Sequence, residues 1–182
     1  MNKKTFNSTE LLEILTFLNS ELAKNKLKLE IAVYGGAAIM LYYGERTRDL
    51  TEDIDAVVLN RQEFGRQPAV FEAVAKRFNL ADDWINSNIM NTLSELKREE
   101  LILFGDFSNI TIKLPNKEQL LAMKVKSARY FPKSDYDDAR QLALELGVDS
   151  LAKLQEIVDE YIPSFLITDD VKKFLCAIME EL

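Results

Sequence analysis

Two adjacent glycines, Gly35 and Gly36, separate an apolar run at residues 29–34 from a second apolar run at 37–43. The first run has the length and composition of a buried strand, and the second is compatible with a helix. Glycine has no Cβ, so a phosphate can approach the backbone closely, and the N-terminus of the following helix offers unpaired N–H groups. The pattern predicts a strand, glycine turn and helix unit that suits a phosphate. For the glycines alone, a plain tight turn is the simpler explanation.

Two carboxylates, Asp53 and Asp55, begin the next apolar segment at 53–59. On a strand, residues two apart point to the same face, about 7 Å apart at the backbone, so both carboxylates can bind shared cations. Oxygen ligands suit Mg²⁺, and paired cations steady the attacking and leaving oxygens of phosphoryl-type transfer. Asp-x-Asp alone more often marks an exposed strand end, but here both acids precede the apolar run 57–59. With the glycine turn, they predict one site for a polyphosphate and its metals.

The periodicity of the remaining chain predicts a mixed sheet followed by helices. Helices are expected near 7–24, 68–78, 82–96, 117–130, 135–146, 150–161 and 169–182, and a strand hairpin at 101–104 and 110–114. We therefore predict an α/β (α+β) fold in which a small mixed sheet is flanked by helices and followed by a helical bundle. The expected division is a core at 1–116 and a helical region at 117–182 that packs on it as one structural unit.

The absence of histidine among the 182 residues limits the chemistry. It excludes histidine-based triads, the HExxH zinc site and the usual proton shuttle at neutral pH. The formal charge of −7 disfavours an indiscriminate nucleic-acid coat, because such proteins neutralise phosphates with a positive field. Segment 113–133 nevertheless holds six basic residues against one acid. That segment suits a polyanion, although a solvated helix face is the commoner meaning of such a run.

The expected location is the cytoplasm. A single cysteine, Cys176, cannot form an internal disulfide, and it stands in an apolar stretch where burial explains it. No run reaches the roughly 18 apolar residues that a membrane span requires, and the first residues do not resemble a signal sequence. We therefore predict a protein that is neither secreted nor membrane-bound.

Lys124 stands out because it falls inside the apolar arc of the predicted helix 117–130. A buried, unpaired ammonium is costly, so this lysine needs an anion or a route to solvent. A lysine that reaches solvent from the edge of the core explains the position about as well. On the next predicted helix, Asp138 shares the apolar face and can meet Lys124 between the two helices. Asp135 shares that face too, but a helix N-cap is enough to explain it.

Taken together, these residues resemble the DNA-polymerase-beta-type nucleotidyltransferase superfamily, particularly its bacterial stand-alone members related to AbiEii-type toxins. The superfamily pattern of a glycine turn, a spacer and Asp-x-Asp stands here in segments 33–38 and 51–55. Segment 82–86, Asp-Asp-Trp-Ile-Asn, is similar to the Asp-Trp-Leu-Asn segment of that branch. Segment 120–148 looks like its Leu-Leu-Ala-Met-Lys, Ala-x-Arg and Asp-x-x-Asp sequence. The resemblance therefore spans most of the chain, and it selects Lys124 independently of the helical periodicity.

The resemblance implies that a nucleoside monophosphate passes from a nucleoside triphosphate to an acceptor hydroxyl, with Mg²⁺ or Mn²⁺ bound and pyrophosphate released. The implied acceptor is RNA such as tRNA, a protein or a small molecule, and a cognate antitoxin is a further expected partner. Asp53 and Asp55 would hold the metal and, with Lys124 and Asp138, form the catalytic set. The nucleotide-binding set would be Gly35, Gly36, Arg46, Arg48, Lys124 and Arg129.

One departure from the superfamily pattern concerns a third acidic residue. Members that transfer nucleotides usually place it on a later strand, but the strand expected at 109–114 has no acid, and Asp106 is the nearest substitute. The AbiEii-like branch also tends to lack that acid, so its absence bears on mechanism more than on fold. A non-catalytic module that binds nucleotide or protein is the alternative function.

Overall fold

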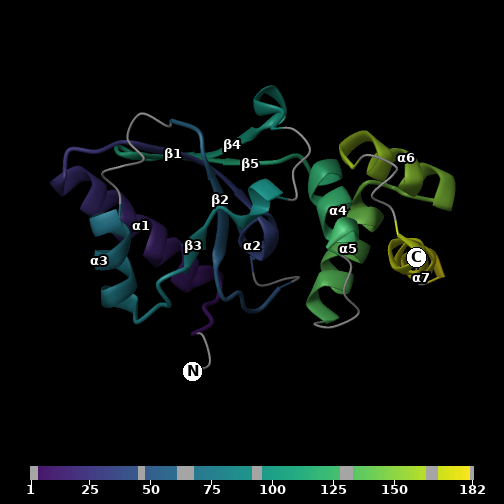
Figure 1. Ribbon diagram of the computed structural model, residues 1–182, viewed down its shortest axis with the longest axis horizontal. Coiled ribbons are helices and arrows are strands. Elements are labelled where there is room, and N and C mark those ends of the chain that lie inside the picture. The colour runs from purple at the N-terminus through teal and green to yellow at the C-terminus, as the bar shows by residue number, and fades with distance from the viewer. Residues whose placement is uncertain are drawn as a thin grey trace. The chain divides into compact units, whose positions relative to one another are not determined.

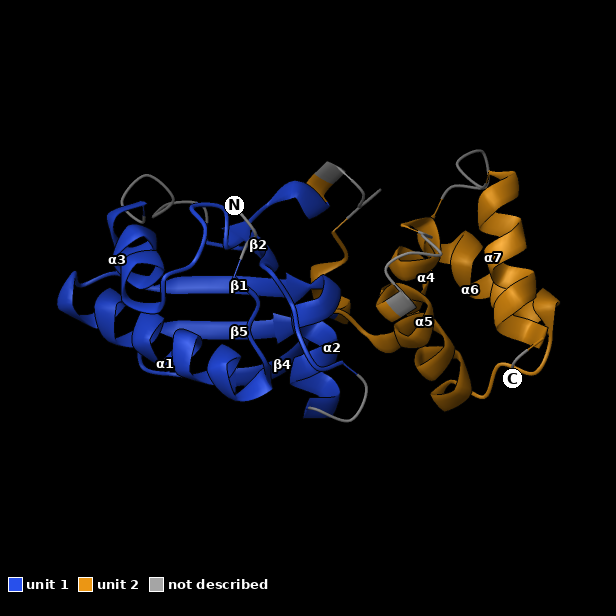
Figure 2. Cartoon of the chain, turned by 90° about the horizontal axis from the view of Figure 1, so that it is seen from below, with its two compact units in different colours: residues 1–89, 101–114 blue, residues 90–100, 115–182 orange. Residues whose placement is uncertain are grey.

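The computed structural model describes residues 4–44, 48–60, 68–91, 96–127, 133–162 and 168–180. The chain divides into two compact units, which Figure 2 shows in different colours. Unit 1 comprises residues 1–89 and 101–114, and unit 2 comprises residues 90–100 and 115–182. The chain therefore enters the second unit briefly at 90–100 before it returns to complete the sheet of the first.

A five-stranded mixed sheet forms the centre of unit 1 (Figure 1). Its strands are β1 (Leu29–Tyr34), β2 (Ile54–Val58), β3 (Ile85–Asn86), β4 (Ile102–Asp106) and β5 (Ile110–Leu114). They lie in the order β3-β2-β1-β5-β4. The β1–β5 and β2–β3 pairs are parallel, whereas β1–β2 and β4–β5 are antiparallel. The predicted α+β class with a small mixed sheet is confirmed.

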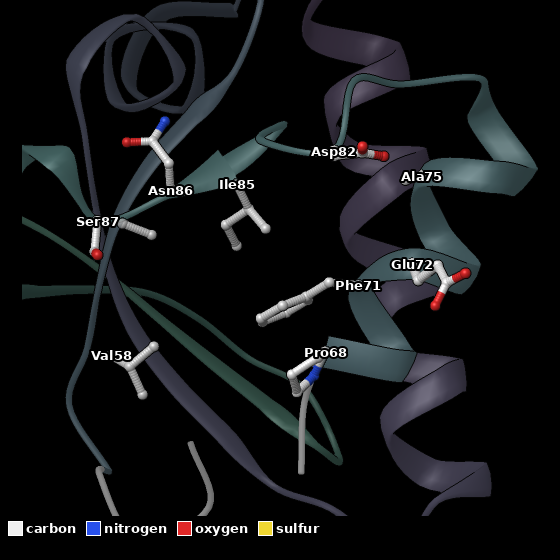
Figure 3. A pocket seen from close by; sticks show the side chains of 10 residues that line it. Val58, Pro68, Phe71, Glu72, Ala75, Asp82, Ile85, Asn86 and Ser87 are labelled. Atoms are coloured by element: carbon white, nitrogen blue, oxygen red, sulfur yellow. The ribbon is translucent and has the colours of Figure 1, made fainter. Parts of the chain in front are cut away.

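The helices in the described part of unit 1 are α1 (Ser8–Lys24), α2 (Gly35–Tyr43) and α3 (Pro68–Phe78). The start of α1 is fixed by a capping box, in which the Asn7 side chain accepts from the Glu10 N–H and the Glu10 carboxylate accepts from the Asn7 N–H. Helix α1 packs against α3, and Figure 1 shows the two side by side. Helix α3 lies over the face of the sheet to which Ala56 and Val58 point, because its residues line one pocket with them (Figure 3).

The helix predicted at 82–96 is wrong in its described part. Instead, the chain forms the short strand β3 and a 3₁₀ turn, η3 (Asn88–Asn91). The Ile54 N–H donates to the Trp84 carbonyl at 2.7 Å, and Ile54 is the register partner of Ile85. Pairing with β2 thus satisfies backbone groups that a helix would have satisfied within itself. The fully buried Trp84 anchors this segment in the core.

Unit 2 is a helical bundle of α4 (Lys117–Lys126), α5 (Lys133–Glu145), α6 (Leu151–Tyr161) and α7 (Asp169–Glu180), with a short 3₁₀ turn, η4 (Arg98–Glu100). Helix α4 contacts the other three helices, and every residue from 119 to 125 is buried. The central position of α4 explains how it can bury polar as well as apolar side chains. The predicted C-terminal bundle is confirmed, and no helix in the described ranges has both the length and the hydrophobicity to cross a membrane.

Cys176 on α7 is exposed, so the prediction that burial explains it is wrong. Val171, Phe174, Leu175 and Ile178 form the buried side of the helix. With 3.6 residues per turn, Cys176 lies away from that side even though its sequence neighbours are apolar. Composition alone therefore misplaced the thiol, whereas helical periodicity places it correctly.

Candidate functional site

The glycine turn begins where β1 ends. Gly35 is the first residue of α2 and has φ +63°, a conformation that residues with a side chain rarely adopt. A Cβ built on Gly35 would lie 2.6 Å from Oδ2 of Asp55. Glycine is therefore required here twice, for its backbone conformation and because the Asp55 carboxylate lies directly against the turn.

The second glycine lies against a cation. A Cβ built on Gly36 would lie 2.5 Å from both Nε and Cζ of Arg48. The Arg48 Nε–H also donates to the Leu50 carbonyl at 3.1 Å, which helps to orient the guanidinium. A guanidinium beside the N-terminus of α2 adds positive charge where the helix dipole and free N–H groups already favour an anion. A carboxylate and a guanidinium thus flank the glycine pair.

The two aspartates lie at the start of β2, next to an amide on β3. Asp55 is the register partner of Tyr34 on one side and of Asn86 on the other. Nδ2 of Asn86 donates to Oδ2 of Asp53 at 3.1 Å, and Oδ1 of Asn86 accepts from the Asn88 N–H at 2.9 Å. Both carboxylates are half-buried. The strand register and the Asn86 side chain therefore hold the pair on one face of the sheet.

Tyr34 shares that face with Asp55, because register partners in a sheet point to the same side. Its ring is fully buried, and among the residues that the structure describes its hydroxyl has no hydrogen-bond partner. Burial raises the pKa of the Tyr34 hydroxyl, so this group is a neutral phenol at physiological pH.

Lys124 belongs to unit 2, where two carboxylates of α5 hold it. Its Nζ lies 2.8 Å from Oδ1 of Asp135 and 2.7 Å from Oδ2 of Asp138. Lys124 is 6% exposed and Asp138 is fully buried. The predicted contact between Lys124 and Asp138 is confirmed, and the ammonium does not project into solvent. Asp135 was explained as an N-cap, yet it binds the same ammonium.

Comparison with known protein families identifies the chain. Residues 9–179 match the family described as "Nucleotidyltransferase of unknown function (DUF6036)". The chain belongs to this family. The match confirms the nucleotidyltransferase superfamily, while the AbiEii-type branch stays a prediction. Comparisons with curated proteins and with solved structures found no match.

The expected third acid of a nucleotidyltransferase does not join Asp53 and Asp55. Asp106 lies on β4, and two strands separate β4 from β2, which corresponds to about 14 Å. There it accepts a hydrogen bond from the Thr111 hydroxyl at 2.8 Å. Asp106 is therefore excluded as the third carboxylate of this site.

On β5, the strand beside β1, the face that Asp55 shares has a lysine instead of an acid. Lys113 is the register partner of Ala32, and Ala32 and Tyr34 point to the same face as Asp55. The Lys113 ammonium lies 2.8 Å from the Glu30 carboxylate. This part of the nucleotidyltransferase sheet therefore differs in charge from the acidic pattern of the superfamily.

The two aspartates nevertheless suit a hard cation. Among the described residues no three His, Cys, Asp or Glu side chains gather into a metal-binding group, so the described part of the chain offers a metal at most two such ligands in one place. Mg²⁺ commonly binds through one or two carboxylates and completes its shell with water and substrate phosphates. The donor set of Asp53 and Asp55 beside a phosphate-compatible glycine turn fits that requirement.

The structure brings some predicted site residues together and adds one that the sequence reasoning did not use. Gly35, Gly36, Arg48, Asp53 and Asp55 all belong to unit 1, whereas Lys124 and Asp138 belong to unit 2. Arg46 and Arg129 lie outside the described residues. Asn86 was overlooked as a site residue, although segment 82–86 had already been matched to a family segment that ends in Asn.

Proposed function

We propose that this nucleotidyltransferase moves a nucleoside monophosphate from a nucleoside triphosphate to an acceptor hydroxyl. The hydroxyl oxygen attacks the α-phosphorus, the bond from that phosphorus to the β-phosphate oxygen breaks, and pyrophosphate leaves. The hydroxyl proton passes to a carboxylate or to solvent. The supporting observation is the glycine turn, where Asp55 lies against Gly35 and Arg48 lies against Gly36.

Each of the candidate site residues in unit 1 has a distinct role in this proposal. The glycine turn and the N-terminus of α2 admit the triphosphate, and Arg48 neutralises part of its charge. Asp53 and Asp55 hold Mg²⁺, or Mn²⁺ in its place, and Asn86 positions Asp53 through its amide. When bound, the metal supplies charge stabilisation for the phosphates during transfer.

Four further residues, Lys124, Asp138, Arg46 and Arg129, belong to the proposed site. Lys124 is proposed to neutralise phosphate charge, and Asp138 to orient it or to act as base. Because Asp135 and Asp138 already hold the ammonium, substrate would have to compete with two carboxylates for it. Arg46 and Arg129 complete the proposed nucleotide-binding set.

The reaction is tested by incubating the pure protein and host RNA with each labelled triphosphate in turn, with Mg²⁺. Transfer of label to an RNA band, to the protein itself or to a small product would report activity, nucleotide choice and acceptor class together. The Asp55→Asn variant is the control, and it should lose at least about 100-fold in rate because metal and phosphate positioning supply most of such catalysis. Equal labelling by wild type and variant would contradict the proposal.

A toxin role in the cytoplasm, with a cognate antitoxin as partner, follows from the AbiEii-like resemblance and is tested separately. Induced expression of the wild-type chain should arrest bacterial growth, whereas the Asp55→Asn variant should not. Growth arrest by both proteins would point to a cause other than nucleotide transfer. Growth with an active wild-type enzyme would remove the toxin role and leave the transferase.

The second candidate is a non-catalytic member of the fold that binds nucleotide or protein. Two features favour it. No third carboxylate joins Asp53 and Asp55 among the described residues, and β5, the strand beside β1, has Lys113 on the face that Asp55 shares. This candidate predicts Mg²⁺-dependent triphosphate binding with no release of pyrophosphate. Measurement of pyrophosphate with each nucleotide and a mixture of acceptors separates the two functions.

A further inference from the structure

Strand β4 forms one edge of the sheet in unit 1, and among the described strands it pairs only with β5 (Figure 1). The other side of its backbone therefore has N–H and C=O groups that a further strand can pair with. Edge strands usually avoid such pairing through lysine, proline, a bulge or a covering element. Residues 101–107 contain no lysine or proline, although the register of β4 shifts once, between Leu103 and Gly105. The edge thus has few of the features that prevent pairing.

The side chains of this edge are apolar and exposed. Ile102, Leu103, Phe104 and Phe107 are 49%, 58%, 37% and 39% exposed, and the consecutive Ile102 and Leu103 point to opposite faces of the sheet. Together the four residues expose on the order of 400 Å² of surface, a patch size that often has a function on a monomer. The other exposed large hydrophobic residues of the described chain stand singly in the sequence. This edge is therefore a candidate interaction surface.

We propose that β4 pairs antiparallel with β4 of a second copy of this chain, about a two-fold axis near Phe104. Each copy then supplies the backbone groups and the apolar side chains that the edge of the other copy requires. Such a contact uses the same surface on both copies, so it closes on itself and leaves no β4 edge open to a third copy. The dimer does not depend on nucleotide transfer.

The single charge on this edge selects the antiparallel direction. Asp106 is the only charged residue within 101–107, and its carboxylate accepts from the Thr111 hydroxyl of its own sheet at 2.8 Å. In the antiparallel pair the two Asp106 residues lie on opposite sides of the axis, about 14 Å apart along the strands, where salt screens their repulsion. In a parallel pair of the same register they would stand side by side, and like charges directly opposite each other are destabilising.

The size of this surface predicts a weak dimer. The four apolar residues of two copies together expose about 800 Å², and the paired backbone adds to the surface that the contact buries. That total approaches the lower limit of about 1,200 Å² for specific, stable interfaces. The register shift at Phe104 also shortens the stretch of regular pairing. We therefore expect a dissociation constant of about 10 µM, so that dimers form only at high protein concentration.

Sedimentation equilibrium of the full chain from about 1 to 300 µM tests the proposal, and wild type should change from monomer to dimer over this range. Leu103→Lys places a lysine on the edge and should weaken dimerisation at least about tenfold. Leu12→Lys is the matched control, because Leu12 is a similarly exposed leucine on α1 and the substitution changes the net charge equally. The control should dimerise as wild type does. Circular dichroism verifies that both variants fold.

Two results of this experiment would overturn the proposal. A wild type that stays monomeric throughout the range would mean that no second copy covers β4, and would leave the edge to a strand of another protein. Equal dimerisation of Leu103→Lys and wild type would place the contact elsewhere on the molecule.

Hydrogen exchange of the wild-type chain locates the contact without any substitution. Amides within 101–107 should exchange at least about threefold more slowly at about 300 µM than at about 1 µM, because strand pairing protects N–H groups from solvent. Amides of α1 should exchange equally at both concentrations. Protection that appears outside 101–107 and not within it would show a different interface and contradict the proposal.

Discussion

The carboxylate pair of unit 1 and the carboxylate pair of unit 2 have opposite surroundings. Asp53 and Asp55 are half-buried beside a glycine turn, and the Asp53 carboxylate accepts from the neutral amide of Asn86. Asp135 and Asp138 instead enclose the ammonium of Lys124 within the bundle. We propose that the first pair holds a metal ion together with substrate phosphates, whereas the second pair holds the ammonium of Lys124. We therefore expect substitution of Lys124 to reduce stability, and substitution of Asp53 or Asp55 to reduce binding.

The largest effect on stability should come from Lys124→Met. This change keeps the aliphatic stem but leaves Asp138, which is fully buried, and Asp135 without their shared ammonium. Removing one partner from a buried ionic cluster typically costs about 3 kcal/mol or more in free energy of unfolding. Urea unfolding followed by circular dichroism measures it, with Lys172→Met, an exposed lysine on α7, as the control, expected within about 0.5 kcal/mol of wild type. Equal stabilities of the two variants would remove the contrast between the units.

A smaller loss of stability is expected at Gly35, where glycine is required both for its backbone conformation and because the Asp55 carboxylate leaves no room for a Cβ. Gly147 also has positive φ, at +59°, but a Cβ there would meet nothing within 4 Å. Gly147→Ala should therefore cost only about 1 kcal/mol, from the backbone conformation alone. Gly35→Ala should cost about 2 kcal/mol, because its Cβ would also displace the Asp55 carboxylate. Thermal unfolding of both variants measures the difference in stability. Equal losses of stability would show that the Asp55 carboxylate moves aside without destabilising the fold.

The parts of the fold that were predictable from sequence are those whose ends are marked by a glycine or a proline in the sequence. The bounds of β1 and β5 are as predicted, because Gly35 and Pro115 mark where the two runs end. The helix expected at 82–96 failed for the opposite reason. The Trp84 carbonyl bonds to Ile54, about thirty residues earlier in the chain, and helical periodicity contains no information about such a partner.

The candidate site was predictable in its residue types but not in its contacts. Glycine and aspartate patterns indicated which residues belong together, since their chemistry is recognisable from spacing. The approach of Arg48 to Gly36 and of Asn86 to Asp53 depends on loop conformation and on the pairing of β3, which spacing does not determine. Asp135 was explained by its place at the start of a helix, but the helix begins at Lys133 and leaves it free to reach Lys124.

The smallest expected effect concerns alkaline pH, where buried tyrosines of both units contribute. Burial raises the pKa of Tyr34 in unit 1 and is also the main reason why the pKa of Tyr161 in unit 2 is raised to about 12. The unfolded chain therefore ionises first, so this contribution to stability is complete below about pH 10 and is lost as the pH rises toward 12 and above.

Tyr34→Phe tests this contribution. Because the Tyr34 hydroxyl has no hydrogen-bond partner among the described residues, the variant should be as stable as wild type at pH 7, or up to about 1 kcal/mol more stable. It should also lose less stability between pH 9 and 11 than wild type, as measured by urea unfolding at each pH. A clear loss of stability at pH 7 would mean that the hydroxyl has a partner, such as a buried water.

We propose that Asp53 and Asp55 form a metal-dependent triphosphate site at the glycine turn. Calorimetric titration with Mg²⁺ and each nucleoside triphosphate tests it on wild type, Asp53→Asn and Asp55→Asn. We predict that wild type binds one or more nucleotides only when Mg²⁺ is present, and that each variant keeps its fold but loses at least about tenfold in affinity. Equal affinities in all three proteins, with and without Mg²⁺, would contradict the assignment.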